Sequence, residues 1–360
     1  MSSYSEKLKN PKWQKKRLEI LERDNWTCQI CSDSENELVV HHKNYEKGKE
    51  PWDYDNNDLI SLCINCHEKE HGVLNSFHIK KGIEKNFDII EKKTLKQEFI
   101  FGIPTGFNSL DSFLGGLKNA ELIVIASRPS IGKTAFSLNI ARNIAVDSNI
   151  PVVIFSLEMT QEQISRRMLC SEARIDSSQL KRGIFSSNNE LKSLDNAANI
   201  LSQAPIFIDS SYDLTLHTIE RRIRNLKSDK NIGIAIIDYI QLFSTNKFEL
   251  SEISRRLKII AKENNIPIIA LSQLDKKIDE RGDKRPLLSD LYEHDIVNNA
   301  DVIIFLYRDE VYNKSYDNHQ KGKVEVIISK QRNGSIGTFY LEYYNNYTLF
   351  ENIKSDEEPL

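Results

Sequence analysis

Long apolar runs are missing from this sequence. No segment approaches the roughly 18–20 uninterrupted apolar residues of a membrane helix, and the first residues, MSSYSEKLKNPKWQKKR, lack the apolar core of a signal peptide. A strong charge of either sign is also missing, because the formal net charge is −3 over 360 residues. We therefore expect a cytoplasmic protein with no membrane partner, whose contacts with any nucleic acid come from local clusters of charge.

Cysteine is scarce and unevenly placed. Four of the five cysteines form two CxxC pairs, Cys28 with Cys31 and Cys63 with Cys66, and all three tryptophans also precede residue 72. This asymmetry predicts a small N-terminal domain over residues 1–72. In a reducing compartment, paired CxxC units of this spacing hold Zn²⁺ between four thiolates more often than they form disulfides. A core this small needs such a staple.

A charged segment without proline, residues 73–100, separates this domain from the rest. Ile79, Ile83, Phe87 and Ile90 are spaced to form one apolar stripe, which predicts an amphipathic linker helix. Such a helix can lie on its own chain or dock on a neighbouring subunit, and periodicity does not separate the two.

Short apolar runs alternate with helical segments over residues 101–350. The runs are nearly continuous and rich in β-branched residues, which is typical of a mostly parallel sheet covered on both faces. They read ELIVIASR, IPVVIFSLE, APIFIDS, IGIAIIDY, IPIIALSQ, ADVIIFLYR and VEVIISKQR. The sequence therefore predicts an α/β domain here, followed by a frayed acidic tail over residues 351–360.

The first strand of that domain leads into a phosphate loop. ELIVIA, SRPSIGKT and AFSLNIARNIA read as strand, turn and helix, and a GKT at such a junction predicts a site for ATP. Backbone N–H groups and the helix N-terminus hold the phosphates, while Lys133 reaches the β- and γ-phosphates and Thr134 binds Mg²⁺. Ser127 stands where glycine is usual, and a small residue still fits the turn. The loop comprises Ser127, Arg128, Pro129, Ser130, Ile131, Gly132, Lys133 and Thr134.

Two further strands are followed by carboxylates. Asp238 ends IAIID, and we expect it to bind Mg²⁺ or to support its ligands. Glu158 ends VVIFSLE, where it is placed to orient and deprotonate the attacking water. Strand ends at one edge of a parallel sheet are where such sheets bind ligands. Taken alone, Glu158 would be a solvated strand-end acid.

The order of these motifs resembles the motor domain of the DnaB-type replicative helicases. GIPTGFNSLD, ASRPSIGKTAFSLNIA, FSLEM, IIDYIQL, IPIIALSQL, ADVIIFLYRDE and SKQRNG follow one another from Gly102 to Gly334. The resemblance implies a RecA-like fold and a homo-oligomeric ring, usually of six subunits, with ATP between neighbours. It also implies that Gln273 is a switch residue linking the γ-phosphate to DNA-contacting loops. Lys330 and Arg332 correspond to residues that enter the adjacent subunit's ATP site.

Three features depart from that family. The segment YIQLFSTNKFELSEIS is shorter and has lost most basic and glycine residues, and DLYEHDIVNNAD is also short and lacks arginine and glycine. The helicases' own N-terminal primase-contacting domain is replaced. ATP hydrolysis is thus better supported than strand separation. Contacts with DNA then depend on Lys276, Lys277 and Arg281, although charge runs of this kind are usually solvated surface.

Histidines distinguish the N-terminal domain from a structural zinc module. His41 and His42 lie on a predicted strand, and His67 and His71 lie four residues apart on a predicted helix, so the set can enclose a second divalent ion. The pattern resembles the HNH nucleases, which have a ββα-metal core. By that resemblance His42 is the base that activates water, His41 and His67 bind Mg²⁺ or Mn²⁺, and His71 is an optional further ligand.

Asparagine is usual at the middle HNH position, which here falls on Asp58, next to Asn57. An amide or a carboxylate could orient the base there. Lys12, Lys15, Lys16 and Arg17 could meet the DNA backbone or form a solvated face.

The favoured function is an ATP-hydrolysing ring motor on DNA that carries nickases, in phage DNA processing or in defence against foreign DNA. One alternative is a nucleotide-gated scaffold that presents inactive zinc modules to DNA. Another is a plain replicative 5′–3′ helicase.

Overall fold

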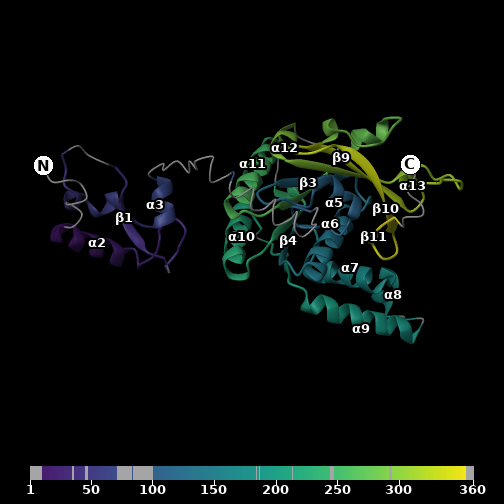
Figure 1. Ribbon diagram of the computed structural model, residues 1–360, viewed down its shortest axis with the longest axis horizontal. Helices are drawn as coiled ribbons and strands as arrows, with labels where there is room; N and C mark the ends of the chain where they lie inside the picture. Colours follow the sequence, from purple (N-terminus) through teal and green to yellow (C-terminus); the bar gives the residue numbers. More distant parts are fainter. Residues whose placement is uncertain are drawn as a thin grey trace. The chain divides into compact units, whose positions relative to one another are not determined.

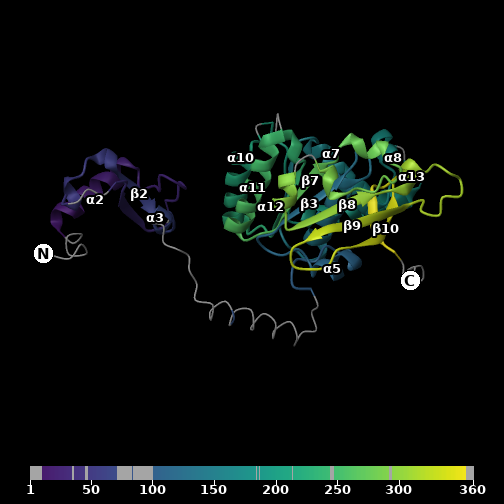
Figure 2. The ribbon, with the colours of Figure 1, turned by 90° about the horizontal axis from the view of Figure 1, so that it is seen from above.

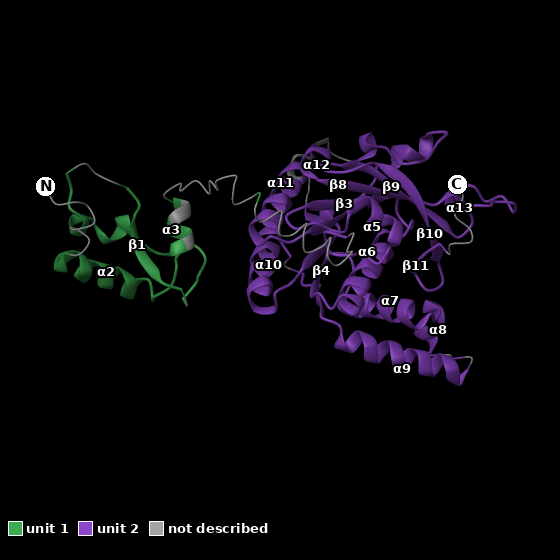
Figure 3. Ribbon diagram, viewed as in Figure 1, with its two compact units in different colours: residues 1–90 green, residues 91–360 purple. Residues whose placement is uncertain are grey.

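The chain divides into two units, Met1–Ile90 and Glu91–Leu360 (Figure 3). The division falls within the predicted linker helix, whose residues lie outside the described part of the chain apart from Ile83 and Ile100. Each unit is considered by itself. The computed structural model describes residues 10–34, 36–44, 48–70, 83, 100–183, 185, 187–212, 214–243, 247–291 and 294–353.

The N-terminal unit pairs two short strands between two helices. Its first helix begins where proline takes the first helical position and the Asn10 side chain accepts a hydrogen bond from the backbone N–H of Lys12 at 2.9 Å. Trp13, Ile20 and Leu21 of that helix are buried in one apolar cluster with the two strands. The elements are α2 (Pro11–Arg23), β1 (Leu38–His42), η1 (Pro51–Asp53), η2 (Asn56–Asp58), β2 (Leu59–Cys63) and α3 (Ile64–Glu70).

A nine-stranded sheet organises the second unit (Figures 1 and 2). Its order is β11-β10-β9-β8-β3-β7-β6-β4-β5. Strands β3 to β8 run parallel, and β9, β10 and β11 extend the sheet as an antiparallel edge. The strands are β3 (Leu122–Ser127), β4 (Val152–Ser156), β5 (Ile206–Asp209), β6 (Ile234–Asp238), β7 (Ile268–Gln273), β8 (Val302–Tyr307), β9 (Lys323–Gln331), β10 (Gly337–Tyr344) and β11 (Leu349–Asn352).

Helices cover both faces of this sheet, as Figure 1 shows. The longer ones are α5 (Asn108–Leu114), α6 (Lys133–Arg142), α7 (Gln161–Ala173), α8 (Ser177–Arg182), α9 (Asn188–Gln203), α10 (Leu216–Lys230), α11 (Lys247–Asn264) and α12 (His294–Asn299). Short turns of helix are η3 (Asn143–Asp147), η4 (Ile240–Phe243), η5 (Lys276–Glu280), η6 (Leu288–Asp290) and α13 (Asp309–Tyr312). No helix among the described residues has both the length and the apolar character needed to cross a membrane.

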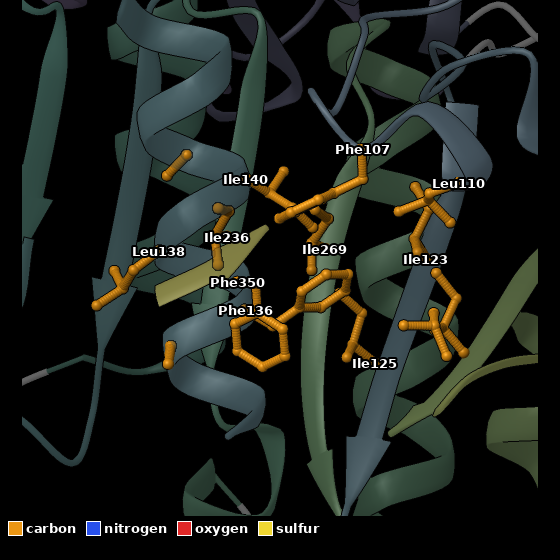
Figure 4. Close-up of a cluster of buried hydrophobic side chains, with 14 of the residues drawn as sticks. Phe107, Leu110, Ile123, Ile125, Phe136, Leu138, Ile140, Ile236, Ile269 and Phe350 are labelled. Atoms are coloured by element: carbon orange, nitrogen blue, oxygen red, sulfur yellow. The ribbon is translucent and has the colours of Figure 1, made fainter. Parts of the chain in front are cut away.

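Alternate residues of the central strands enter two separate cores. Ile123 and Ile125 of β3 pack with Phe136 of α6 on one face (Figure 4), while Leu122 and Val124 pack under α10 and α11 on the other. All six residues of β3 are therefore buried, which explains why this strand lacks polar alternation. The predicted mostly parallel α/β sheet is confirmed.

Three boundaries differ from expectation. Strand β4 ends at Ser156, so Glu158 lies two residues beyond it in the connection to α7. The antiparallel strands β10 and β11 were not expected. Because β11 runs to Asn352, the predicted tail begins inside a strand, and its residues 354–360 lie outside the described part.

Candidate nucleotide site and N-terminal metal centre

The phosphate loop joins the end of β3 to the start of α6. Lys133 is the first residue of α6, so the GKT sequence itself forms the helix N-terminus, where free N–H groups favour phosphate. Gly132 precedes it at φ +120°, and a Cβ there would lie 3.2 Å from the ring of Phe350. Both the backbone angle and the close ring favour glycine at this position.

Lys133, Thr134 and Asp238 meet at this loop. Nζ of Lys133 lies 3.3 Å from Oδ1 of Asp238, and the Thr134 hydroxyl donates to Oδ2 of the same carboxylate at 2.8 Å. Lys133 is 8% and Asp238 3% exposed, so the charges interact in a poorly solvated place. Adjacent ligands of octahedral Mg²⁺ at 2.0–2.1 Å lie about 2.9 Å apart, so the hydroxyl and carboxylate oxygens fit two such positions.

Glu158 and Gln273 lie at the same carboxyl edge of the sheet. Ser156 of β4 pairs with Asp238 of β6, which places the connection carrying the exposed Glu158 beside this edge. Gln273 ends β7 directly opposite Ser127, the first residue of the phosphate loop. The four strand ends that the sequence singled out therefore lie around one loop.

Tyr239 is a contact of the site that the sequence did not single out. Its ring centroid lies 4.3 Å from Nζ of Lys133, a cation–π distance. The sequence signal that could have identified Tyr239 was its position immediately after Asp238.

Lys330 and Arg332 lie at the opposite edge of the sheet from their own phosphate loop. Strand β9 runs antiparallel to β8, with Lys330 opposite Ile303 at the beginning of β8. Because β3 and β8 are parallel, the start of β8 is remote from the end of β3, where the loop begins. These two side chains are therefore turned away from the nucleotide site of their own chain.

Both side chains hold the carboxyl end of α12. Nζ of Lys330 donates to the carbonyl of Ala300 at 2.6 Å and to that of Val297, and Nη2 of Arg332 donates to the carbonyl of Asn298 at 2.5 Å. Cations at the last carbonyls of a helix are favourable.

The expected DNA-contacting residues separate into two groups. Lys276 and Lys277 are exposed on η5. Arg281 instead forms two hydrogen bonds of 2.9 Å with Asp290, so its charge is already paired within the chain. In the N-terminal unit, Lys12 and Lys15 are exposed and Lys16 is half-buried, whereas Arg17 donates to the carbonyl of Leu38 at 3.0 Å.

Four cysteine sulfurs converge in the N-terminal unit. The Sγ atoms of Cys28, Cys31, Cys63 and Cys66 all lie within 4.8 Å of one another, and Cys31 is 3.7 Å from Cys63. Thiolates 2.3 Å from a tetrahedral Zn²⁺ lie about 3.8 Å apart, so these residues fit the ion. Within the described ranges, no other group of three or more potential ligands converges in this way.

The predicted nuclease histidines fall on two sides of β1. The ring centroids of His41 and His67 are 5.2 Å apart and the two rings are nearly perpendicular, so the structure brings these two predicted ligands close together. His71 lies outside the described residues. The backbone carbonyl of Asp58, the residue at the middle HNH position, accepts a hydrogen bond from the N–H of Lys43 at 2.8 Å. The N–H of the neighbouring Asn57 donates to the side chain of Asp55.

His42 is enclosed by aromatic rings. It stacks on Trp13 at 5.0 Å, meets the edge of Tyr54 at 4.6 Å and is 2% exposed. Its Nε2 lies 3.1 Å from the carbonyl oxygen of Pro51, which can only accept, so Nε2 carries the proton and Nδ1 is the basic nitrogen. Burial lowers the pKa of His42, against the smaller opposing effect of the Pro51 carbonyl, and this shift favours the neutral ring over the charged one.

Comparison with known proteins gives consistent matches to DnaB-like helicases. The family model of the DnaB-like helicase C terminal domain matches residues 102–352. The replicative DNA helicase DnaB of Geobacillus stearothermophilus is 42% identical over 285 residues, which cover 77% of this chain and 62% of that protein. The chain thus spans less than two thirds of that relative.

Two solved structures share the fold at moderate identity. One is described as an ATPase domain and is 35% identical with a TM-score of 0.73, over 78% of this chain and all of that domain. The other, a DnaB-like replicative helicase described together with its interactions with primase, is 34% identical with a TM-score of 0.69, over 81% of this chain and 72% of that one.

Proposed function

The chain belongs to the family of DnaB-like helicase C-terminal domains, and from that membership we propose that it is an ATP-hydrolysing motor that moves on DNA, as a replicative helicase does. The observation that carries the proposal is the meeting of Lys133, Thr134 and Asp238 at a phosphate loop. Bound Mg²⁺ would neutralise charge on the β- and γ-phosphates.

This chain's own residues perform the remaining tasks. The loop N–H groups and Lys133 hold the phosphates in line for attack. Glu158, exposed at the same edge, orients water and takes its proton. Gln273, beside the loop, responds to the γ-phosphate and passes the change to the exposed lysines of η5.

A neighbouring subunit completes the site in this proposal. Lys330 and Arg332 are remote from their own phosphate loop but belong to a chain whose family resemblance implies a ring. An arginine supplied from a neighbour stabilises charge on the transferred phosphoryl group and makes hydrolysis depend on assembly.

Mixing two inactive variants tests this arrangement. We expect Lys133→Ala and Arg332→Ala each to hydrolyse ATP slowly, and their equimolar mixture to recover roughly a quarter of the wild-type rate, because random assembly pairs an intact loop with an intact arginine at that frequency. Steady-state ATP turnover after subunit exchange measures it. A mixture no faster than the mean of its two components would show that the arginine acts within its own chain.

A nuclease activity of the N-terminal unit is a second proposal. It is supported by the contact of His42 Nε2 with the Pro51 carbonyl and by the proximity of His41 to His67. A divalent cation would polarise the scissile phosphate. Nδ1 of His42 would take a proton from water as the water oxygen attacks the phosphorus and the bond to the 3′-oxygen breaks. The leaving 3′-oxygen then takes a proton from solvent, which gives nicks with 5′-phosphate and 3′-hydroxyl ends.

Plasmid nicking in Mg²⁺ or Mn²⁺ tests the nuclease. We expect His42→Ala to lower the nicking rate by about 100-fold, because it removes the general base. His217→Ala, an exposed histidine on α10, is the matched control and should nick at the wild-type rate. Zn²⁺ content should be unchanged in both. Equal nicking by wild type and His42→Ala would exclude His42 as the general base, and no nicking by either would favour a scaffold with inactive zinc modules.

Stimulation of ATP turnover by DNA separates a motor from such a scaffold. A motor should hydrolyse ATP faster when DNA is present. A nucleotide-gated scaffold should hydrolyse ATP slowly and at the same rate with or without DNA. A helicase motor joined to a nuclease would suit phage DNA processing and defence against foreign DNA equally.

A further inference from the structure

Gln241 lies on η4, three residues beyond Asp238, and contacts the end of the neighbouring strand β7. Its Nε2 donates to the hydroxyl of Ser272 at 2.8 Å and to the carbonyl of Gln273 at 3.1 Å. Its Oε1 accepts from the backbone N–H of Gln273 at 3.2 Å. One side-chain amide therefore satisfies both backbone groups of the residue that ends β7.

The hydrogen bonds of the Gln241 side chain lie just beyond the point where backbone pairing between β6 and β7 ends. The last paired residues of the two strands are Ile237 and Ala270, so Gln273 has no backbone partner on β6. The amide of Gln241 bonds Gln273 as a strand neighbour would, accepting from its N–H and donating to its carbonyl. On its other side, Gln273 is opposite Ser127 of β3. Gln273 is thus held between the β3 segment that leads into the phosphate loop and the segment that follows Asp238.

The segment after Gln273 is tied to the phosphate loop as well. The N–H of Leu274 donates to the carbonyl of Ser127 at 3.1 Å, and Arg128 donates to the Leu274 carbonyl at 3.1 Å and pairs with Asp279 at 2.6 Å. The exposed lysines of η5 lie between these two ties. A displacement of Asp238 or its connection would therefore reach η5 through Gln241 and Gln273.

We infer that Gln241 is a positioning residue: its side-chain amide couples the Mg²⁺-binding carboxylate segment to Gln273 and so to η5. The inference rests on the proposed motor function and deepens it. Gln241 does not reach the nucleotide contacts itself, because its amide is committed to β7. Its loss should uncouple the nucleotide site from DNA and leave nucleotide binding in place.

Gln241→Ala and Gln241→Glu test the inference. In both, we expect the dissociation constant of a fluorescent ATP analogue to stay within about twofold and stimulation of turnover by single-stranded DNA to fall by about fivefold or more. Gln241→Glu should be the more severe, because a carboxylate would face the carbonyl of Gln273 without a donor. Gln203→Ala, an exposed glutamine at the end of α9, is the matched control.

Hydrogen exchange gives a second readout that needs no DNA. In the wild type, a non-hydrolysable ATP analogue should slow exchange over residues 274–280, and this response should vanish in Gln241→Ala while melting temperature stays within a few degrees. Ser272→Ala combined with Gln241→Ala should add little to either effect, as expected for partners in one contact.

The outcomes separate the two proposals. The role of Gln241 would be overturned if Gln241→Ala kept the wild-type stimulation of ATP turnover by DNA and also kept the slowing of hydrogen exchange by the ATP analogue. The role would also be overturned if the variants lost DNA stimulation only to the extent that their melting temperature fell, because Gln241 would then serve only to stabilise the fold. A wild type that DNA does not stimulate, but whose exchange response requires Gln241, would contradict the motor and support the coupling.

Discussion

We expect Lys133→Ala to lower the proposed ATP turnover by about 10³-fold, the cost of removing a preorganised charge from a phosphoryl-transfer site. The effect is large because Lys133 begins α6, is nearly buried and supplies the cation that pairs with Asp238. Steady-state release of phosphate measures it. Lys192→Ala, an exposed lysine on α9, should turn over ATP at the wild-type rate.

A loss of fold must be distinguished from a loss of chemistry in that experiment. Alanine would leave the Asp238 carboxylate buried without its cation, which is costly. Lys133→Met keeps the aliphatic stem beside the Tyr239 ring and removes only the charge. Both variants leave the Asp238 carboxylate without its cation, so both should melt at a lower temperature than wild type. Turnover is therefore compared at a temperature where each variant is folded, and both should have lost it. Turnover within twofold of wild type in Lys133→Met would refute the assignment of this loop.

Removal of zinc is expected to unfold the N-terminal unit while the motor continues to hydrolyse ATP. We predict one Zn²⁺ per chain, lost in Cys63→Ser and retained in Cys170→Ser, since Cys170 is buried in α7 of the other unit. Structural Zn²⁺ contributes about 10–16 kcal/mol of binding free energy in small domains, far more than a core of this size supplies.

A single serine should be enough to lose the ion, because the four converging sulfurs together complete one tetrahedral Zn²⁺ site. Burial raises the pKa of Cys28, but the backbone N–H groups of Cys31, Cys63 and Ile30 together outweigh it and lower that pKa to about 7. Burial raises the pKa of Cys31 and of Cys66, so Zn²⁺ must displace the protons of those two thiols when it binds. Metal analysis and proteolysis with and without a chelator measure the result. A chelated protein whose N-terminal unit still resisted protease, or a Cys63→Ser variant that kept its zinc, would contradict the staple.

Local patterns in the sequence predicted more of the site than of its surroundings. The phosphate loop and the strand ends around it could be foreseen because each is a continuous segment whose chemistry follows from adjacent residues. Strand β10 was missed because Phe339, Leu341 and Tyr343 alternate with outward residues, a weaker signal than the continuous runs of the parallel strands. Strand β11 has only four residues.

Contacts between distant residues could not be foreseen in this way. The pairing of Arg281 with Asp290 and the attachment of Lys330 to α12 depend on how segments nine and more than thirty residues apart come together. A charge run in the sequence does not reveal which cations are already neutralised. The contact of Gln241 with β7 likewise spans more than thirty residues.

The antiparallel course of β9 has a consequence for how this protein would behave at low abundance. Since β9 carries Lys330 and Arg332 to the edge remote from their own loop, a solitary chain holds every catalytic residue but no complete site in the proposed arrangement. Its rate per chain would then rise with concentration and vanish on dilution, without any change in the fold. Gene dosage alone could therefore switch such an enzyme on, with no inhibitor or modification involved.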